Sequence, residues 1–161
     1  MIRDPLEWIE SWYRYRARAE LGNSKHEAHD RYTGNIGYNE FIESYIAAGN
    51  RQPFAQIRTL YDFMRLDNGD IGVDYIFPLD RMDLVTDFLF RKTGAIIHLP
   101  HENVSPQISR LRLDRTLEAS LRDYLSIDIA LYDLVKKNDA FNNALHGDKF
   151  YASLGIMGAA G

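Results

Sequence analysis

The chain has no cysteine among its 161 residues. Disulfide bonds, thiolate zinc sites and cysteine nucleophiles are therefore excluded. No uninterrupted apolar run approaches the roughly 20 residues that a membrane-spanning helix needs. The N-terminal stretch Met1-Ile2-Arg3-Asp4-Pro5 does not have the pattern of a signal peptide. We therefore expect a cytoplasmic domain without a membrane span.

Positive charge is also in short supply. The 19 Lys and Arg residues face 23 Asp and Glu residues, which gives a net charge of −4 and a pI of about 5.7. A protein that binds duplex nucleic acid through its phosphates is normally basic, so we expect no nucleic-acid partner. The apolar fraction of 45% and the charged fraction of 26% are typical of globular proteins. We expect residues 1–161 to form a single domain whose last residues, after about 150, fray.

The basic residues that are present are mostly arginine, with 14 Arg against 5 Lys. Arginine presents a planar fork that contacts phosphate or sulfate at two points, which lysine cannot do. The excess is weak evidence for an anion site, because genomes rich in G and C also enrich arginine.

The hydrophobic pattern predicts a mostly helical chain with a few short strands. Helices are expected over residues 4–21, 38–48, 53–60 (with an extension to 65 left open), 81–91 and 113–137, the last as one helix or two. A short strand is expected within 71–77, a strand or extended link over 95–99, and polar loops over 22–37 and 101–108. After residue 138 the pattern thins out.

The first helix has an unusually clear start. Asp4 is a candidate N-cap, Pro5 suits the first helical position, and Glu7 completes a variant of the capping box. Arg3 lies just before this start, at the end of what reads as a strand, and Ser11 follows Arg3 by eight residues. A helix start favours a nearby anion, and the two side chains add a charge and a hydroxyl donor. Without wider context, an ordinary surface pair is the commoner interpretation.

The wider string supplies that context. Residues 3–16 resemble the 3′-phosphate-binding segment of sulfotransferases that use 3′-phosphoadenylyl sulfate (PAPS), in which a strand ends in Arg-Asp-Pro or Arg-Asn-Pro and a helix follows. The family has a serine eight residues after the arginine and an aromatic residue soon after. The match covers Arg3, Asp4, Pro5, Ser11 and Tyr13. Less specific similarity to bacterial members continues downstream at 38–41, 72–77, 103–106 and 123–132.

The resemblance implies an α/β fold of the P-loop-like sulfotransferase type, truncated at the N-terminus, mostly helical and with a few short parallel strands. It implies that PAPS is the co-substrate, that no metal is needed, and that the partners are this nucleotide and an unidentified hydroxyl or amine acceptor. Arg3 and Ser11 would hold the 3′-phosphate. The polar loop over 22–37 is where we would look for acceptor contacts.

The family pattern is incomplete in this chain. The phosphosulfate-binding loop of the Lys-Ser/Thr-Gly-Thr kind, which should precede Arg3, is absent from the sequence, and no catalytic base is assigned. The alternative is an inactive truncated paralogue that acts as a helical interaction module or is a remnant, with self-association through an exposed sheet edge. A nucleotide kinase or GTPase is disfavoured because no G-x-x-x-x-G-K-[ST] motif occurs.

Other candidates have plainer interpretations. The segment 91–94 has the letters Arg-Lys-Thr-Gly of a phosphate loop, but it follows a helix and reads as a helix end. The histidines and aspartate within 26–30 could bind a metal, although a solvated loop is favoured. The histidines at 98 and 101 could bind a metal or act as a general base, although a surface or packing role is favoured. The aspartates of 67–70 read as a plain turn.

Aromatic residues crowd the first helix. Trp8, Trp12, Tyr13 and Tyr15 could stack on an adenine or a sugar ring. Core packing is the favoured interpretation for the two tryptophans, and the roles of the two tyrosines stay open.

Overall fold

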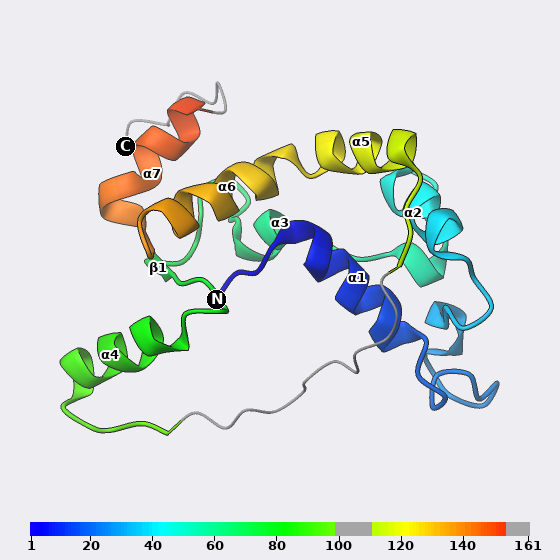
Figure 1. Cartoon of the computed structure of the whole chain (residues 1–161), viewed down its shortest axis with the longest axis horizontal. Helices are drawn as coiled ribbons and strands as arrows, with labels where there is room; N and C mark the ends of the chain where they lie inside the picture. The colour runs from blue at the N-terminus through cyan, green and yellow to red at the C-terminus, as the bar shows by residue number, and fades with distance from the viewer. Residues whose placement is uncertain (99–110, 154–161) are drawn as a thin grey trace. The chain divides into compact units, whose positions relative to one another are not determined.

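The computed structural model describes residues 1–98 and 111–153 (Figure 1). The described chain is mostly helical, at 54%, as the sequence predicts. The α-helices are α1 (Pro5–Arg16), α2 (Tyr38–Ile46), α3 (Leu60–Met64), α4 (Met82–Thr93), α5 (Arg115–Tyr124), α6 (Ser126–Lys137) and α7 (Asn143–Ser153). Two short 3₁₀ helices span His29–Arg31 and Pro53–Ala55, and the strands are β1 (Tyr75–Ile76) and β2 (Phe141–Asn142). No helix within the described ranges is long and apolar enough to cross a membrane.

The chain divides into two compact units. Unit 1 consists of Met1–Asp4, Thr59–Asn103 and Ile127–Gly161, and unit 2 consists of Pro5–Arg58 and Val104–Ser126. The division falls between Asp4 and Pro5, at the point where α1 begins.

Unit 2 is built from α1, α2 and α5. Phe41, Ile42 and Tyr45 of α2 are buried, and α5, whose buried residue is Leu121, packs against the same helix. Its fully buried apolar side chains are Ile9, Phe41, Ile42, Tyr45, Ala55, Leu121 and Leu125. Burial of such side chains stabilises a fold by about 1.5–3 kcal/mol each.

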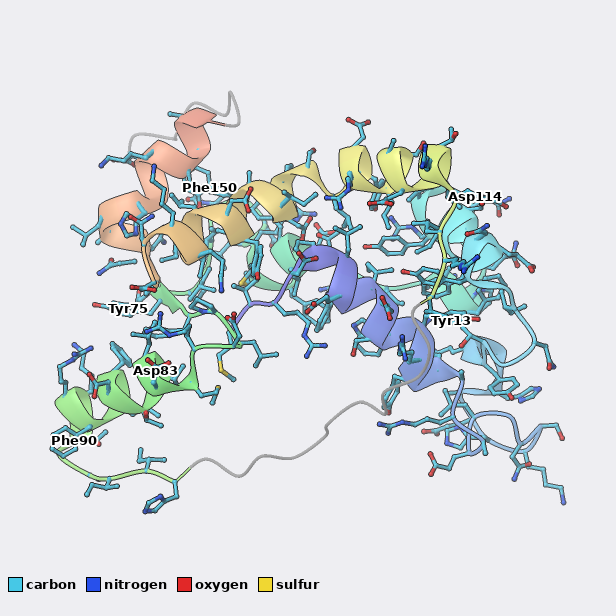
Figure 2. All side chains as sticks on the ribbon, in the orientation of Figure 1. Tyr13, Tyr75, Asp83, Phe90, Asp114 and Phe150 are labelled. Atoms are coloured by element: carbon cyan, nitrogen blue, oxygen red, sulfur yellow. The ribbon has the colours of Figure 1, made fainter. Side chains whose placement is uncertain are left out.

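Polar contacts add to the packing of α2 against α5. The guanidinium of Arg51 lies over the rings of both Tyr45 and Tyr124, 5.0 and 5.3 Å from their centroids, and donates to the Tyr124 hydroxyl. At the other end of the pair, Asn39 Nδ2 donates to Asp114 Oδ2 at 2.9 Å. Figure 2 labels Asp114, which directly precedes α5. These contacts fix the two helices along their shared length.

The sheet of unit 1 differs in one respect from expectation. β1 and β2 pair antiparallel, with Ile76 opposite Phe141, whereas the family resemblance implies parallel strands. The run 71–77 contributes only Tyr75 and Ile76 to the ladder, because Gly72 and Asp74 within it are poor strand formers. Parallel pairing occurs in the described chain at one isolated bridge, between Ile2 and Pro78.

Two helix boundaries also differ from the predicted ones. α1 ends at Arg16 rather than near residue 21, because the backbone N–H of Thr33 donates a hydrogen bond to the Arg16 carbonyl at 3.1 Å. The helix predicted over 53–60 is only the 3₁₀ turn Pro53–Ala55. A separate short helix, α3, begins after Thr59, whose hydroxyl accepts a hydrogen bond from the Asp62 N–H at 3.1 Å.

The segment after residue 138 is more ordered than its pattern predicts. It contains β2 and α7, and it buries Phe141 and Phe150 completely and Tyr151 almost completely. The Phe141 and Phe150 rings meet edge to face at 6.2 Å, and the Tyr151 hydroxyl accepts a hydrogen bond from the Ile71 N–H. These aromatic contacts anchor α7 in unit 1.

Helix α4 forms where the sequence predicts a helix, but none of its residues is fully buried. Phe88 packs against Tyr75 and Phe77, with ring centroids 4.8 and 5.3 Å apart. Figure 2 labels Phe90 near the end of α4, where half of the residue is exposed. The apolar face of α4 is therefore only partly covered by unit 1.

Candidate phosphate-binding residues around the first helix

The chain enters α1 from an extended segment, as the sequence predicts. Ile2 is 1% exposed and is held on both sides of its peptide unit. Its N–H donates to the Phe77 carbonyl at 2.8 Å, and its carbonyl accepts from the Leu79 N–H at 2.7 Å. Arg3 follows directly, is partly exposed, and forms no ion pair with any residue that the structure describes.

Helix α1 begins at Pro5, the position that the sequence predicts (Figure 1). Proline suits the first helical position because its ring fixes φ and the N–H that it lacks would have no helical partner. The next N–H groups of the first turn have no carbonyl within the helix to bond. They give the start of α1 a partial positive charge that attracts an anion.

Ser11 lies on the more accessible side of α1. The buried residues of this helix are Pro5, Ile9 and Arg16, which share one face. Ser11 and Tyr15 lie one turn apart on a different face, and Ser11 is partly exposed. The Ser11 hydroxyl can therefore donate to a ligand from solvent.

The two residues of the predicted pair fall on opposite sides of the division of the chain. Arg3 belongs to unit 1 and Ser11 to unit 2. A joint site formed by Arg3 and Ser11 therefore stays a prediction. The structure describes the surroundings of Arg3 within unit 1 and those of Ser11 within unit 2.

The end of α1 is fixed by the loop that follows it. Thr33 is fully buried, and its hydroxyl donates to the Tyr13 carbonyl at 2.8 Å while its N–H donates to the Arg16 carbonyl. The Tyr13 carbonyl also accepts from the Ala17 N–H at 3.1 Å, whereas the Arg16 carbonyl lies at the helix end and is satisfied by the Thr33 N–H in place of water. The Tyr13 hydroxyl also donates to the Ile36 carbonyl at 2.7 Å. The expected polar loop over 22–37 is thus tied to α1.

Arg16, the second arginine of the run, is committed to structure. It is 5% exposed, and its guanidinium donates to the carbonyls of Pro53, Phe54 and Gln56 at 3.1, 2.8 and 3.1 Å. Burial lowers the pKa of Arg16 to about 10, with a smaller contribution from the positive charge of Arg31. Its donors point to protein carbonyls and are not offered to a ligand.

Arg14 has a carboxylate partner within the protein, whereas Arg18 has none among the described residues. Arg14 pairs with Glu10 one turn earlier, with its Nε 3.0 Å from the carboxylate. Arg18 is exposed and has no carboxylate partner among the described residues, and its guanidinium lies 4.5 Å from the ring centroid of Tyr15. Arg18 is therefore the arginine of this run with donors turned to solvent.

The aromatic residues of α1 divide into packed and exposed members. Tyr13 packs against Tyr38 and Phe41, with centroids 5.1 and 5.2 Å apart, and burial raises its pKa. Tyr15 is 46% exposed. The two tyrosines that the sequence left open therefore have different environments, and only Tyr15 presents its ring to solvent.

No motif in the sequence singles out Arg18 for its contact with Tyr15. The signal that could have found it is the spacing of three residues between them, which places two side chains on the same side of a helix turn. Arg18 lies two residues beyond Arg16, the last residue of α1, so the contact requires the helical spacing to persist past the end of the helix.

The apparent phosphate loop at 91–94 is a helix end, as its plainer interpretation predicts. Gly94 has φ of 70°, and its N–H closes the last turn of α4 on the Phe90 carbonyl at 2.8 Å. Glycine suits this left-handed conformation because it has no Cβ. Lys92 lies over the ring of Phe88, 5.8 Å from its centroid.

The histidine candidates do not form a metal site in the described residues, where no group of three potential ligands comes together. His26 Nδ1 accepts from the Ala28 N–H, and His29 Nδ1 lies 2.9 Å from the Leu21 carbonyl. His98 is exposed, and the histidine at 101 lies outside the described residues.

The aspartates of 67–70 belong to a turn. Asn68 Nδ2 donates to the Asp70 carboxylate at 2.7 Å, and Asn68 Oδ1 accepts from the Asp70 backbone N–H at 3.1 Å. Gly69, with φ of 91°, supplies the left-handed position that this turn requires.

Searches with protein-family models, among curated proteins and among solved structures find no match to this chain.

Proposed function

We propose that this chain supplies the 3′-phosphate-binding part of a sulfotransferase that uses PAPS. The observation that carries the proposal is the order of elements around Arg3. An extended, hydrogen-bonded Ile2 is followed by Arg3, the start of α1 at Pro5 and an accessible Ser11 on that helix. This is the order that the resemblance requires. Arg3 has no carboxylate partner among the described residues that would compete with a bound anion for its guanidinium.

The proposed chemistry is in-line transfer of a sulfuryl group from PAPS to a hydroxyl or amine. A base removes the acceptor proton as the sulfur–oxygen bond to the leaving phosphate breaks and the bond to the acceptor forms. Arg3 and Ser11 hold and orient the donor nucleotide and take no part in bond making. No residue of this chain is assigned as the base.

The test is calorimetric titration of the chain with adenosine 3′,5′-bisphosphate, the product that remains after sulfuryl transfer. Adenosine 5′-monophosphate, which lacks the 3′-phosphate, is the matched ligand. Because charge-assisted hydrogen bonds contribute about 1.5–3 kcal/mol each, we expect Arg3→Ala and Ser11→Ala to weaken binding of the bisphosphate by at least about tenfold and fivefold. Neither change should alter the weak binding of the monophosphate.

Two exposed residues provide control variants. Arg58 forms no ion pair with described residues, and Ser120 lies on the exposed face of α5. We expect Arg58→Ala and Ser120→Ala to leave the affinity unchanged. Equal affinity of the wild-type chain for the two nucleotides, or equal losses in the site and control variants, contradicts the proposal.

The second candidate is a helical interaction module, and the observation that favours it is α4. This helix carries Leu84, Val85, Phe88 and Leu89 on its apolar stripe, and none of them is fully buried. Partly covered apolar side chains on a helix mark surfaces where partners bind. In this interpretation α4, rather than the expected sheet edge, is the surface for self-association.

Sedimentation velocity over a range of protein concentrations tests this second candidate. Self-association through α4 predicts a dimer that Leu89→Ser weakens, since Leu89 belongs to the apolar stripe and is only partly buried. A control change at exposed Leu145 of α7, Leu145→Ser, should have no effect. A concentration-independent monomer excludes self-association.

A further inference from the structure

Tyr15 lies one helical turn beyond Ser11 on the same side of α1. Four residues along a helix correspond to about 6 Å. A nucleotide whose 3′-phosphate is bound by the Ser11 hydroxyl would therefore have this ring within reach of its base. The inference below rests on the proposed function, because it assigns the seat of the base at the same site.

The Tyr15 ring is exposed and yet held in place. Its centroid is 5.6 Å from that of Trp12, with an angle of 77° between the ring planes. Trp12 is in turn held edge to face by Trp8, at 5.6 Å and 84°. Because Trp12 meets Tyr15 at a steep angle, it supports the ring without stacking on it.

Arg18 completes the arrangement. Its guanidinium lies 4.5 Å from the centroid of the Tyr15 ring and has no carboxylate partner among the described residues. Arg18 follows the end of α1 in an exposed turn, so its side chain can rotate away from the ring. A planar guanidinium stacks on a nucleobase as readily as on tyrosine.

The other aromatic residues of α1 are less suited to this role. Tyr13 is engaged by Tyr38, Phe41 and the Ile36 carbonyl. The indole N–H groups of Trp8 and Trp12 are buried. Tyr15 is the one aromatic side chain of α1 that combines high exposure with a fixed orientation.

We propose that Tyr15 stacks on the purine base of the nucleotide and that Arg18 closes over the opposite face of the base. The ring then discriminates adenosine 3′,5′-bisphosphate from a sugar bisphosphate without a base, while Ser11 recognises the phosphate common to both. Tyr15 is thereby a specificity-determining residue that has no role in sulfuryl transfer itself.

The test is titration of the chain with adenosine 3′,5′-bisphosphate and with ribose 3,5-bisphosphate, which lacks the base. Stacking of a base on an aromatic ring contributes about 1–3 kcal/mol. We expect Tyr15→Leu to weaken binding of the adenosine ligand about tenfold, which corresponds to about 1.4 kcal/mol, and to leave binding of the ribose ligand unchanged. Tyr15→Phe, which keeps the ring, should bind both ligands as the wild type does.

Arg18 has its own pair of variants. Arg18→Ala should weaken binding of the adenosine ligand about threefold or more. A loss of charge alone would weaken the ribose ligand as well, whereas a loss of stacking acts only on the ligand that has a base. For that reason Arg18→Lys is the informative partner. We expect it to behave as Arg18→Ala does, because an ammonium keeps the charge but cannot stack as a plane.

The outcomes separate this inference from the proposed function. If wild-type chain binds neither bisphosphate, the proposed function fails and the inference fails with it. If the wild type binds the adenosine ligand and Tyr15→Leu binds it equally well, or weakens both ligands equally, only the seat at Tyr15 is overturned. Circular dichroism of each variant checks that this exposed substitution leaves the helices intact.

Discussion

Asp128 Oδ1 accepts a hydrogen bond from the backbone N–H of Tyr61 at 2.8 Å. The contact joins α6 to the first turn of α3 inside unit 1, and Asp128 is 2% exposed. The Thr59 hydroxyl also donates to this carboxylate. A buried acid thus supplies the acceptor that the N–H groups at the start of α3 lack within their own helix.

Removal of this acceptor should destabilise unit 1. Asp128→Ala leaves the buried Tyr61 N–H without a partner, which costs about 1–3 kcal/mol. Asp128→Asn keeps an oxygen in the same place and should cost less. Urea unfolding followed by circular dichroism measures both changes. A cost for Asp128→Ala no greater than that of a surface change such as Asp133→Ala contradicts this role.

The same carboxyl should make stability depend on pH. Burial raises the pKa of Asp128 above its ordinary value of 3.8, and the hydrogen bonds from Tyr61 and Thr59 offset part of this effect. The folded chain therefore binds this proton more tightly than the unfolded chain does. The associated stability is fully present below pH 3.8 and is lost as pH rises through the raised pKa. Unfolding experiments across that interval should show a shallower slope in Asp128→Asn, and an identical slope contradicts the assignment.

Arg16 should be essential for the folded state of unit 2. Replacement by leucine leaves the carbonyls of Pro53, Phe54 and Gln56 without this donor, at an expected cost of about 3 kcal/mol. Arg16→Lys should recover only part of the loss, because an ammonium cannot match the planar fork. Thermal unfolding measures the series, with the exposed Arg18→Leu as control. Equal effects at the two positions exclude the proposed role of Arg16.

Thr33 should stabilise the end of α1 through its hydroxyl. Thr33→Val keeps the shape of the side chain and removes the donor to the Tyr13 carbonyl, so we expect a loss of about 1–2 kcal/mol. Thr33→Ser keeps the donor and should lose less. Hydrogen exchange at the last turn of α1 reports the change locally, and unaltered protection there in Thr33→Val is the contrary result.

Local signals in the sequence were sufficient for several elements. Pro5 marks the start of α1, and Gly94 marks the end of α4, because each residue has a backbone preference that holds in any context. The extended segment before Arg3 was also predictable from its position ahead of a capped helix. Parallel strands were expected from the resemblance. Among the described residues, parallel pairing is limited to the single bridge between Ile2 and Pro78.

Other features depend on partners far along the chain. The carbonyls that bind Arg16 lie nearly 40 residues away, so nothing around Arg16 indicated that its charge is buried. Helix α7 has a weakly periodic sequence with Gly147 inside it, and its anchoring depends on the packing of Phe150 and Tyr151. Tertiary packing outweighs local propensity at such positions.

The most direct test of the central claim is phosphorus-31 NMR of adenosine 3′,5′-bisphosphate during titration with the chain, because it observes the two phosphates separately. The account predicts that the 3′-phosphate resonance shifts and broadens far more than the 5′-phosphate resonance, and that Ser11→Ala reduces this difference. Equal changes at both phosphates, or a change confined to the 5′-phosphate, would contradict a 3′-phosphate site at Arg3 and Ser11.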